Sequence, residues 1–259
     1  MLRTENIHYH IGKKQILQNV NATFLPGAFS MILGPNGSGK STFLKIFSGE
    51  LKANEGVVFY GDEDIHDLSK PELARFRSVM SQQPELNFPI TVEEVVMMGR
   101  YPHFNVAPLK KDEHICDEVM QLMNLLHFKE RNYLTLSGGE KQRVQFARVL
   151  AQIWEPFQEN AHRYLFLDEP LNSLDINYQK EFLDIAQVFA SKGVTVVAVM
   201  HDINLAIQYG THLIFLKEGK VVMQGGPKQI ISKELIKEVY NIEANIIANP
   251  LDGRPLVVF

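Results

Sequence analysis

The segment that most constrains this chain is Gly34-Pro35-Asn36-Gly37-Ser38-Gly39-Lys40-Ser41, which fits G-x-x-x-x-G-K-[ST] at every fixed position. The apolar run Phe29 to Leu33 before it predicts a buried strand, and Ser41 to Phe47 after it predicts a helix. A strand, a glycine-rich turn and a helix in this order gather backbone N–H groups at a helix N-terminus, where they bind phosphate. The segment, called the phosphate loop below, therefore predicts an α/β fold around a phosphate site.

Two side chains of the phosphate loop are suited to a nucleotide. Lys40 supplies a positive charge for the β- and γ-phosphates, and the Ser41 hydroxyl is placed to bind Mg²⁺. Thr42 is expected to contact the nucleotide at the same helix start. A glycine-rich turn that carries a lysine by chance is the alternative, and the flanking strand and helix argue against it.

A second apolar run, Tyr164 to Leu167, ends in two carboxylates, Asp168 and Glu169. Short continuous apolar runs are typical of strands buried on both faces of a parallel sheet. Asp168 at the strand's carboxyl end can hold Mg²⁺, directly or through water, and Glu169 can polarise an attacking water. Two solvated acids at a strand end are common by themselves, but together with the phosphate loop they predict a nucleoside triphosphatase.

The order of patterns along the chain predicts strands that enclose a mainly helical segment. Ile7, Tyr9 and Ile11 alternate with polar positions and predict an early strand, and Val194 to Val199 predicts another buried one. Alternation of strands and helices favours an α/β architecture with right-handed crossovers. We expect a single domain over 1–259, with its core at about 1–83 and 152–225, a helical insertion at about 84–151 and a C-terminal tail at about 226–259.

One amphipathic stripe stands out within the predicted insertion. Its members fall on one face of a helix and are Ile115, Val119, Leu122, Met123 and Leu126. We expect this stripe to pack against neighbouring helices.

Charge and hydropathy exclude several classes of protein. With 26 Lys and Arg against 30 Asp and Glu, the formal net charge is 26 − 30 = −4, and no basic block stands out. This balance argues against binding to nucleic acid or to an anionic membrane surface. Met1 to Asn6 lacks the apolar core of a signal peptide, and no apolar run approaches the roughly 20 residues that span a bilayer. We expect a protein that stays in the cytoplasm.

The pentapeptide Leu136-Ser137-Gly138-Gly139-Glu140, called the signature segment below, decides the class of triphosphatase. Ser137 and Glu140 fit the capping box S-x-x-E and predict the start of a helix. Gly138 and Gly139 in the first turn cost helix stability, which suggests that a ligand approaches the backbone closely there. The segment is a second phosphate-binding surface, and one nucleotide need not touch both surfaces within one chain.

With these three motifs the sequence resembles the ATP-binding subunits of ABC transporters over nearly the whole chain. The resemblance implies a P-loop NTPase core of the ABC type, with a mainly parallel sheet, an N-terminal antiparallel β part and an inserted helical subdomain. It also implies a head-to-tail homodimer. Each ATP, with its Mg²⁺, would lie between the phosphate loop of one subunit and the signature segment of the other.

The same resemblance implies roles for residues outside the three motifs. Gln82 resembles the glutamine that binds near Mg²⁺ and couples to the permease, with Gln83 as the alternative register. Tyr9 resembles the aromatic residue that stacks on adenine, and an ordinary strand aromatic is the alternative. Asp175 resembles a residue of the loop that crosses the dimer interface. His201 resembles the switch histidine that contacts the γ-phosphate and orients the water.

The reaction expected from this resemblance is in-line attack of water on the γ-phosphate, with Glu169 as the general base. Lys40, His201 and Mg²⁺ would stabilise the developing charge, joined by Ser137 and Gly139 of the partner chain. Closure of the dimer on ATP and its opening after hydrolysis would drive transport.

Two stretches resemble one group of importers, those of ferric siderophores, vitamin B12 and haem: Val95 to His103 and the tail from Gly226 to Pro255. Within that group, Ala147 to Gln152 and the long link Trp154 to His162 favour haem, with ferric siderophore or vitamin B12 as the alternatives. We therefore expect permease partners, a periplasmic substrate-binding protein and a peripheral position on the cytoplasmic face of the inner membrane. A soluble ABC ATPase that acts as an assembly scaffold, for example for iron–sulfur clusters, is the alternative from another class.

Overall fold

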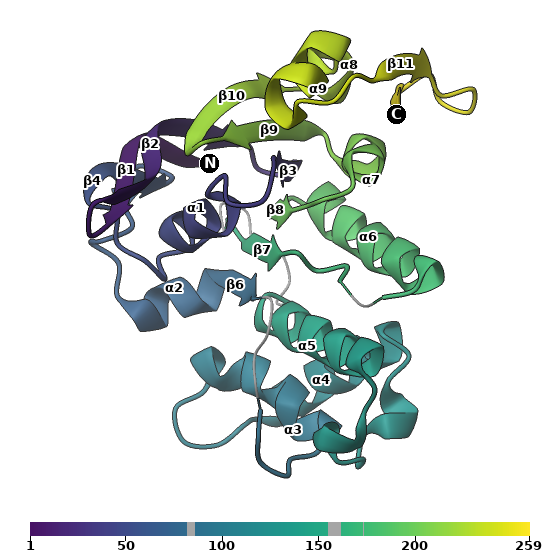
Figure 1. Cartoon of the computed structure of the whole chain (residues 1–259). Coiled ribbons are helices and arrows are strands. Elements are labelled where there is room, and N and C mark those ends of the chain that lie inside the picture. The colour runs from purple at the N-terminus through teal and green to yellow at the C-terminus, as the bar shows by residue number, and fades with distance from the viewer. Residues whose placement is uncertain (82–85, 155–161, 173) are drawn as a thin grey trace. The chain divides into compact units, whose positions relative to one another are not determined.

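The computed structural model describes residues 1–81, 86–154, 162–172 and 174–259 (Figure 1). These residues form two units. The first comprises Met1–Leu68 and Ile185–Phe259, and the second comprises Ser69–Asp184. The limits expected from the sequence for core, insertion and tail remain a prediction.

An antiparallel sheet forms the N-terminal part of the first unit. It contains β1 (Leu2–Ile11), β2 (Lys14–Phe24), β4 (Glu55–Tyr60) and β5 (Glu63–Asp64) in the order β2-β1-β4-β5. Helix α1 (Lys40–Phe47) packs beside it through aromatic rings, since the Phe47 ring centroid lies 5.0 Å from those of both Phe24 and Phe43. The predicted N-terminal antiparallel part is therefore confirmed.

Parallel strands form the centre of the first unit. β3 (Phe29–Leu33) lies between β8 (Thr195–Val199) and β9 (His212–Lys217) and runs parallel to both, while β10 (Lys220–Gly225) pairs antiparallel with β9. Every residue of β3 and β8 is buried. Burial on both faces explains why these strands are apolar without alternation, and it confirms the mainly parallel sheet expected here.

The C-terminal residues add short elements to the first unit: α7 (Ile203–Tyr209), α8 (Pro227–Ile230), α9 (Lys233–Tyr240), β11 (Asn245–Ala248) and β12 (Pro255–Val258). β11 and β12 form an antiparallel hairpin. The side-chain amide of Asn204 in α7 donates to the Val257 carbonyl at 3.0 Å and accepts from the Val257 N–H at 2.9 Å. Asn204 therefore pairs with the Val257 backbone as a neighbouring strand would, and it holds the hairpin against α7.

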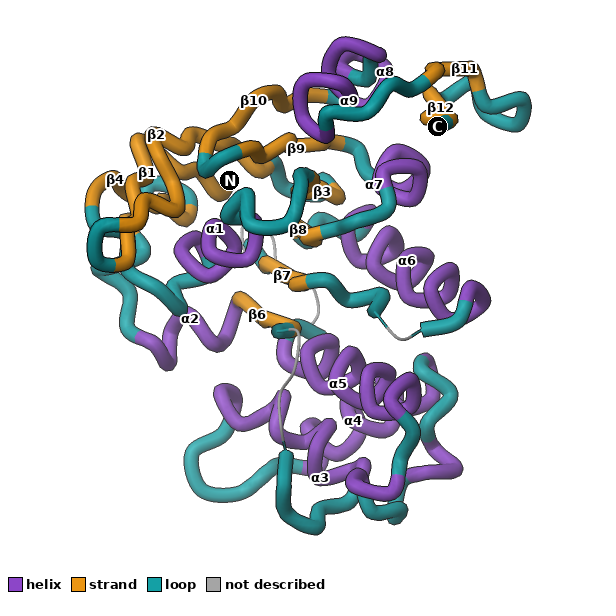
Figure 2. Tube along the Cα trace, in the orientation of Figure 1, coloured by secondary structure: helices purple, strands orange, loops and turns teal. Residues whose placement is uncertain are grey.

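The second unit contains a short parallel strand pair and several helices, and Figure 2 shows that helices make up most of it. The strands are β6 (Arg77–Met80) and β7 (Tyr164–Asp168), with Met80 paired with Leu167. The helices are α2 (Lys70–Phe76), α3 (Val92–Met97), η1 (Met98–His103), α4 (Lys110–Leu122), η2 (Leu126–Phe128), η3 (Tyr133–Thr135), α5 (Gly138–Gln152) and α6 (Ile176–Ser191), whose last turns belong to the first unit. The expected helical insertion is thus present in the part of the chain that the structure describes.

The predicted apolar stripe is correct in part. Ile115, Val119 and Met123 are at most 5% exposed, but Leu122 and Leu126 are 40% and 44% exposed. Leu122 is the last residue of α4, and Asn124 has a left-handed φ of 56° that turns the chain away before Leu126. Leu126 then begins η2 and no longer continues the face of α4.

A buried ion pair fixes the segment between α3 and α4. The Arg100 Nε donates to the Asp112 carboxylate at 3.0 Å, and the two side chains are only 1% and 4% exposed. Arg100 also donates to the Ala151 carbonyl of α5 at 2.7 Å. Next to it, a Cβ at Gly99 would lie 2.1 Å from the Arg148 carbonyl oxygen, so η1 lies directly against α5.

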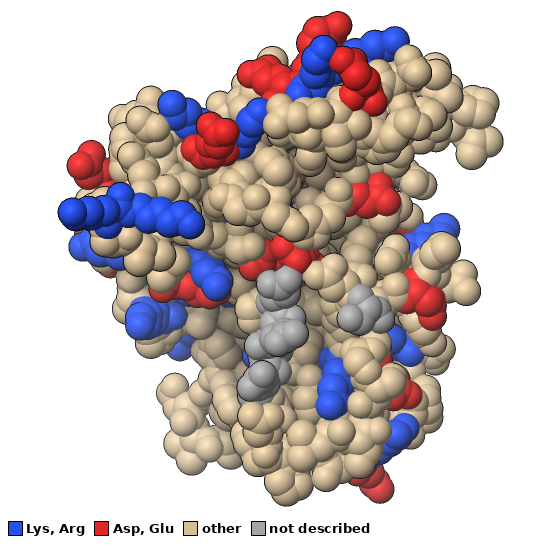
Figure 3. Space-filling view, in the orientation of Figure 1, with Lys and Arg blue, Asp and Glu red and all other residues tan. Residues whose placement is uncertain are grey.

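Opposite charges are interspersed on the face of the molecule shown in Figure 3, with Lys and Arg next to Asp and Glu. This mixture agrees with the small formal net charge of −4. Within the described ranges, no helix combines the length and the apolar character needed to cross a bilayer.

We predict that Asp112→Ala lowers the free energy of unfolding by about 3–5 kcal/mol, because it leaves the Arg100 charge buried without its carboxylate. Denaturant unfolding followed by circular dichroism measures this loss. The matched control is Glu5→Ala, which removes the partner of Arg3 from a pair whose glutamate side chain is 53% exposed. It should cost less than about 1 kcal/mol. Equal losses in the two variants would contradict the prediction.

Candidate functional site

The phosphate loop connects β3 to α1 through a turn that only glycine fits. Gly34, Gly37 and Gly39 have φ values of 147°, 80° and 101°, which side chains disfavour. A Cβ at Gly34 would lie 2.0 Å from the Leu216 carbonyl oxygen, and one at Gly39 would lie 2.7 Å from the Cδ2 atom of Leu17. The backbone can therefore turn sharply enough to place α1 directly behind the loop.

Two neighbouring segments support the loop from outside. Gly219, in the turn between β9 and β10, donates its N–H to the Ser38 carbonyl at 3.1 Å. The Gly219 carbonyl accepts from the N–H of Gln18 in β2 at 2.8 Å. A Cβ at Gly219 would lie 2.3 Å from the Ile16 carbonyl oxygen, so this turn and β2 are in close contact. The loop conformation is set by strands far from it in sequence.

Lys40 and Ser38 bring polar groups to the loop. Lys40 is 5% exposed, and its Nζ donates to the carbonyls of Gly34 and Pro35 at 3.0 and 3.1 Å. Ser38 is 2% exposed, and its Oγ has no hydrogen-bond partner among the described residues. A buried hydroxyl without a partner costs free energy that a ligand oxygen can recover. Together with the start of α1, these groups fit a bound phosphate.

The strand order places His201 at the same sheet edge as the phosphate loop. β3 and β8 are parallel neighbours, with Ile32 paired with Val199, and the Met200 N–H donates to the Ile32 carbonyl at 3.0 Å. The carboxyl ends of parallel neighbours lie at one edge of a sheet, where ligands bind. His201, which is exposed, and the phosphate loop follow these two ends.

Tyr9 lies on a strand that adjoins the loop. It is half-buried in β1, and its partner in the ladder with β2 is Leu17. Leu17 is the residue whose side chain limits the space at Gly39. Tyr9 is thus linked to the loop through Leu17, which pairs with Tyr9 in the strand ladder and lies against Gly39. The stacking of Tyr9 on adenine stays a prediction.

In the second unit, the two predicted carboxylates end β7 in a well-fixed turn. Asp168 is 4% exposed. Glu169 has a φ of 49°, unusual for a residue with a side chain, and its carboxylate accepts from the Asn172 side-chain amide at 2.9 Å. Gln142 of α5 donates to the carbonyl of Pro170 at 2.7 Å. The turn therefore holds the Glu169 carboxylate in one orientation.

The signature segment forms the predicted capping box. The Ser137 N–H donates to the Glu140 carboxylate at 2.7 Å, and the Glu140 N–H donates to the Ser137 Oγ at 3.3 Å. The Ser137 backbone and hydroxyl hydrogen bonds hold the pKa of the Glu140 carboxyl below its usual value. Nothing lies within 4 Å of a Cβ built at Gly138, so the first turn of α5 is open to a ligand.

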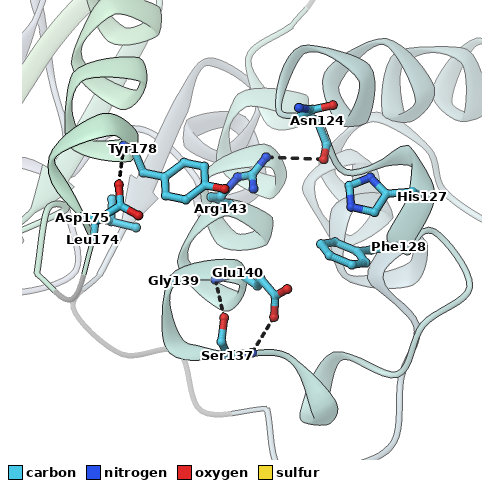
Figure 4. Close-up of a pocket in the computed structure, with 10 residues that line it drawn as sticks. All are labelled: Asn124, His127, Phe128, Ser137, Gly139, Glu140, Arg143, Leu174, Asp175 and Tyr178. Carbon is cyan, nitrogen blue, oxygen red and sulfur yellow. Dashed lines mark hydrogen bonds between the residues drawn. The ribbon is translucent and has the colours of Figure 1, made fainter.

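A cavity of about 530 Å³ opens beside the signature segment (Figure 4). Ser137 and Gly139 line it together with Asp175, so three predicted site residues share one cavity. The Asp175 carboxylate accepts from the Tyr178 N–H at 3.0 Å. The Tyr178 ring covers the guanidinium of Arg143, whose Cζ lies 4.6 Å from the ring centroid. The other lining residues are Asn124, His127, Phe128, Glu140 and Leu174.

Sequence reasoning missed Arg143, Tyr178 and the contact of Gln142 with the strand end. Arg143 lies on the buried side of α5 beside Val144. Because a charged side chain is seldom buried without an interaction partner, its position in the helix pattern could have indicated such a partner. No signal of this kind marks Tyr178 or Gln142, because their partners are distant in sequence.

The remaining predicted residues lie in separate units. Lys40, Ser41 and His201 belong to the first unit, and Asp168 and Glu169 belong to the second. Gln82 and Gln83 fall outside the described residues. The complete magnesium set of Ser41, Gln82 and Asp168 therefore stays a prediction.

The comparison with known families agrees with this geometry. A family model described as "ABC transporter" matches residues 17–172. The chain belongs to the ABC transporter family. The hemin import ATP-binding protein HmuV of Gloeobacter violaceus is 42% identical to this ABC protein over 258 residues, which cover 100% of this chain and 94% of the relative.

Solved structures of ABC proteins have the same fold. A metal-chelate type ABC transporter in an inward-facing conformation matches with a TM-score of 0.81 at 23% identity, over 100% of this chain and 97% of that one, and shows the fold alone. A dimeric ATP-binding cassette with ADP and phosphate bound matches with a TM-score of 0.74 at 29% identity, over 87% and 98%. This ABC protein is an ATPase.

We predict that Gly34→Ala destabilises the protein far more than Gly37→Ala. The new methyl group at Gly34 would overlap a backbone oxygen, whereas nothing lies within 4 Å of a Cβ at Gly37. Gly37→Ala should lower the free energy of unfolding by only about 1–2 kcal/mol, the cost of placing a residue with a Cβ in the left-handed conformation. Thermal unfolding of the two variants measures the difference, and similar melting temperatures would contradict the close approach at Gly34.

Proposed function

We propose that this chain is the ATP-hydrolysing subunit that energises haem import across the inner membrane. The observation that carries the proposal is the full-length similarity to proteins named as hemin import ATP-binding proteins, at 42% identity for one and 41% for another from Bordetella pertussis. The subunit would act as a homodimer with a permease dimer, at the cytoplasmic face of the membrane. A periplasmic substrate-binding protein would deliver the haem.

ATP would bind first through the phosphate loop. Lys40, now held by two loop carbonyls, would turn its ammonium to the β- and γ-phosphates, and the unpartnered Ser38 hydroxyl would gain an oxygen partner. Backbone N–H groups from Gly37 to Thr42 would face the phosphates. Tyr9 would stack on the adenine.

Mg²⁺ fits the chemistry of the proposed ligands. Ser41 offers a hydroxyl, Gln82 an amide oxygen and Asp168 a buried carboxylate, and such oxygens are the donors that Mg²⁺ prefers. The ion would neutralise charge on the β- and γ-phosphates.

Glu169 would accept the proton of the attacking water. The Asn172 side-chain amide donates a hydrogen bond to its carboxylate and so restricts the orientation of this acid. His201, at the sheet edge that also holds the phosphate loop, would contact the γ-phosphate and orient the water. Lys40 would stabilise the charge that develops in the transition state.

The signature segment would bind the ATP held by the partner subunit. Ser137, Gly138 and Gly139 present the open N-terminus of α5, and Asp175 lines the same cavity. A partner's nucleotide would bring negative charge to this helix start, which favours anions. The arrangement supports a head-to-tail dimer in which each site needs both chains.

We predict that Glu169→Gln retains ATP binding but lowers kcat by at least about 100-fold, because the general base is lost. It should also trap an ATP-dependent dimer, which size-exclusion chromatography detects. Glu130→Gln, which changes an exposed acid in the same unit, is the matched control and should hydrolyse ATP normally. A wild-type rate in Glu169→Gln would refute the assignment of the base.

Transport itself is tested in cells that lack other haem importers and carry Glu169→Gln as the only copy. We predict loss of labelled haem uptake, while uptake of ferric siderophore and vitamin B12 continues. Loss of siderophore or vitamin B12 uptake instead would keep the mechanism and change the substrate. Normal uptake of all three would favour a soluble assembly scaffold, which should then fractionate away from the membrane.

A further inference from the structure

Helix α5 contacts the chain on both sides of Asp175. Before it, the Gln142 side-chain amide donates to the Pro170 carbonyl at 2.7 Å. After it, the ring of Tyr178 in the first turn of α6 lies over the guanidinium of Arg143, with 4.6 Å between the Arg143 Cζ and the ring centroid. Two consecutive residues of α5 therefore contact the chain on either side of a predicted interface residue.

The Arg143 guanidinium is fixed by backbone carbonyls that follow α4. Arg143 is 7% exposed, and its Nη2 donates to the carbonyl of Met123 and, at 3.3 Å, to that of Asn124. Its Nε has no hydrogen-bond partner among the described residues. A guanidinium is planar and always charged, so one that is held at its edge offers a fixed positive face to an aromatic ring.

Tyr178 connects this fixed charge to Asp175. The Asp175 carboxylate accepts from the Tyr178 N–H at 3.0 Å and so caps the start of α6. One residue further on, the Gln179 side-chain amide donates to the Leu174 carbonyl at 3.1 Å, and Leu174 is only 8% exposed. The first turn of α6 and Asp175 are thus joined, and a shift of the Tyr178 ring would move both.

The same helix also carries the signature segment. Arg143 lies six residues after Ser137 in chain order, which is about 9 Å along the axis of α5. Figure 4 shows the Tyr178 ring extending from α6 to Arg143, with Asp175 at the start of α6. Ser137 and Asp175, which line one cavity, are therefore connected through contacts that lie within the second unit.

We infer that Arg143 and Tyr178 are positioning residues, whose contact holds Asp175 and Ser137 in the arrangement that receives the partner subunit with its nucleotide. The inference rests on the proposed head-to-tail dimer. Asp175 and Ser137 would touch the partner, and Arg143 and Tyr178 would act through them. A surface that already has its binding geometry associates more tightly, because less conformational freedom is lost on binding.

The test is Tyr178→Leu, which removes the aromatic face and keeps an apolar side chain at a position that is 37% exposed. It is made in the Glu169→Gln protein, in which the ATP-dependent dimer can be measured at equilibrium by sedimentation. We expect the dimer dissociation constant at saturating ATP and Mg²⁺ to rise about three- to thirtyfold. One dimer contains two copies of the contact, and each has the strength of an ordinary cation–π pair.

Binding of ATP to a single chain should not change. The Kd of Tyr178→Leu for mant-ATP, measured at protein concentrations too low for dimers, should equal that of the parent protein. The phosphate loop and Tyr178 belong to different units, so loss of the ring leaves the loop intact. A general loss of folded protein would instead weaken both kinds of binding.

Two matched variants serve as controls. Tyr178→Phe keeps the ring and should restore the dimer dissociation constant of the Glu169→Gln protein. Tyr101→Leu removes another exposed ring of the second unit, one that is 56% exposed and packs edge-on against Phe104 at 5.7 Å between ring centroids. Tyr101 does not line the cavity, so its loss should leave the dimer unchanged.

Arg143→Lys tests whether Tyr178 acts through the guanidinium. Lysine keeps the charge but lacks the planar group that lies against the ring. In the Arg143→Lys background, Tyr178→Leu should therefore weaken the dimer by a clearly smaller factor than it does with Arg143 present. Equal factors in the two backgrounds would show that the Tyr178 ring touches the partner directly, and would overturn the positioning role.

Two further results would overturn the inference. One is an unchanged dimer dissociation constant in Tyr178→Leu, even if the melting temperature falls, since that would show a purely structural ring. The other is a weakened dimer in Tyr178→Phe equal to that in Tyr178→Leu. Failure of the Glu169→Gln protein itself to dimerise with ATP would refute the proposed dimer, and this inference with it.

Discussion

The first unit depends on the contact between Gly34 and the backbone of Leu216. A Cβ at Gly34 would lie only 2.0 Å from the Leu216 carbonyl oxygen, so only glycine fits here. Glycine lets the chain turn sharply after β3 and enter the loop that leads to α1. The contact joins the loop to β9, and β9 in turn carries the Gly219 turn and Lys217. Contacts with neighbouring strands therefore help to set the shape of the phosphate loop, together with the hydrogen bonds of Lys40 within it.

In the second unit α5 plays a comparable part. Ser137 caps its start, Gln142 contacts the turn that holds Glu169, and the Ala151 carbonyl near its end accepts from Arg100. A helix is a stiff element, so these three contacts keep fixed positions relative to one another. The same helix thus carries the signature segment, supports the proposed general base and anchors the segment between α3 and α4.

Local signals predicted local structure well. The capping box at Ser137 is formed by residues within a few positions of one another, where sequence pattern and backbone geometry are directly linked. The motif of the phosphate loop likewise correctly marked the place between a buried strand and a helix. The apolar stripe failed at Leu126, because the apolar periodicity continues past the end of α4, where the left-handed Asn124 turns the chain. A pattern of apolar residues marks a face but does not mark where the helix stops.

The sequence by itself determined the chemistry of this protein, since a glycine-rich loop with Lys40 and a strand that ends in Asp168 and Glu169 need particular residue types at particular spacings. Only the tertiary structure decided which distant residues support that chemistry. The contacts of Leu216 with Gly34, of Arg143 with Tyr178 and of α9 with Lys217 of β9 join segments far apart in the chain. Strand order and helix packing create such contacts, and no spacing along the sequence encodes them.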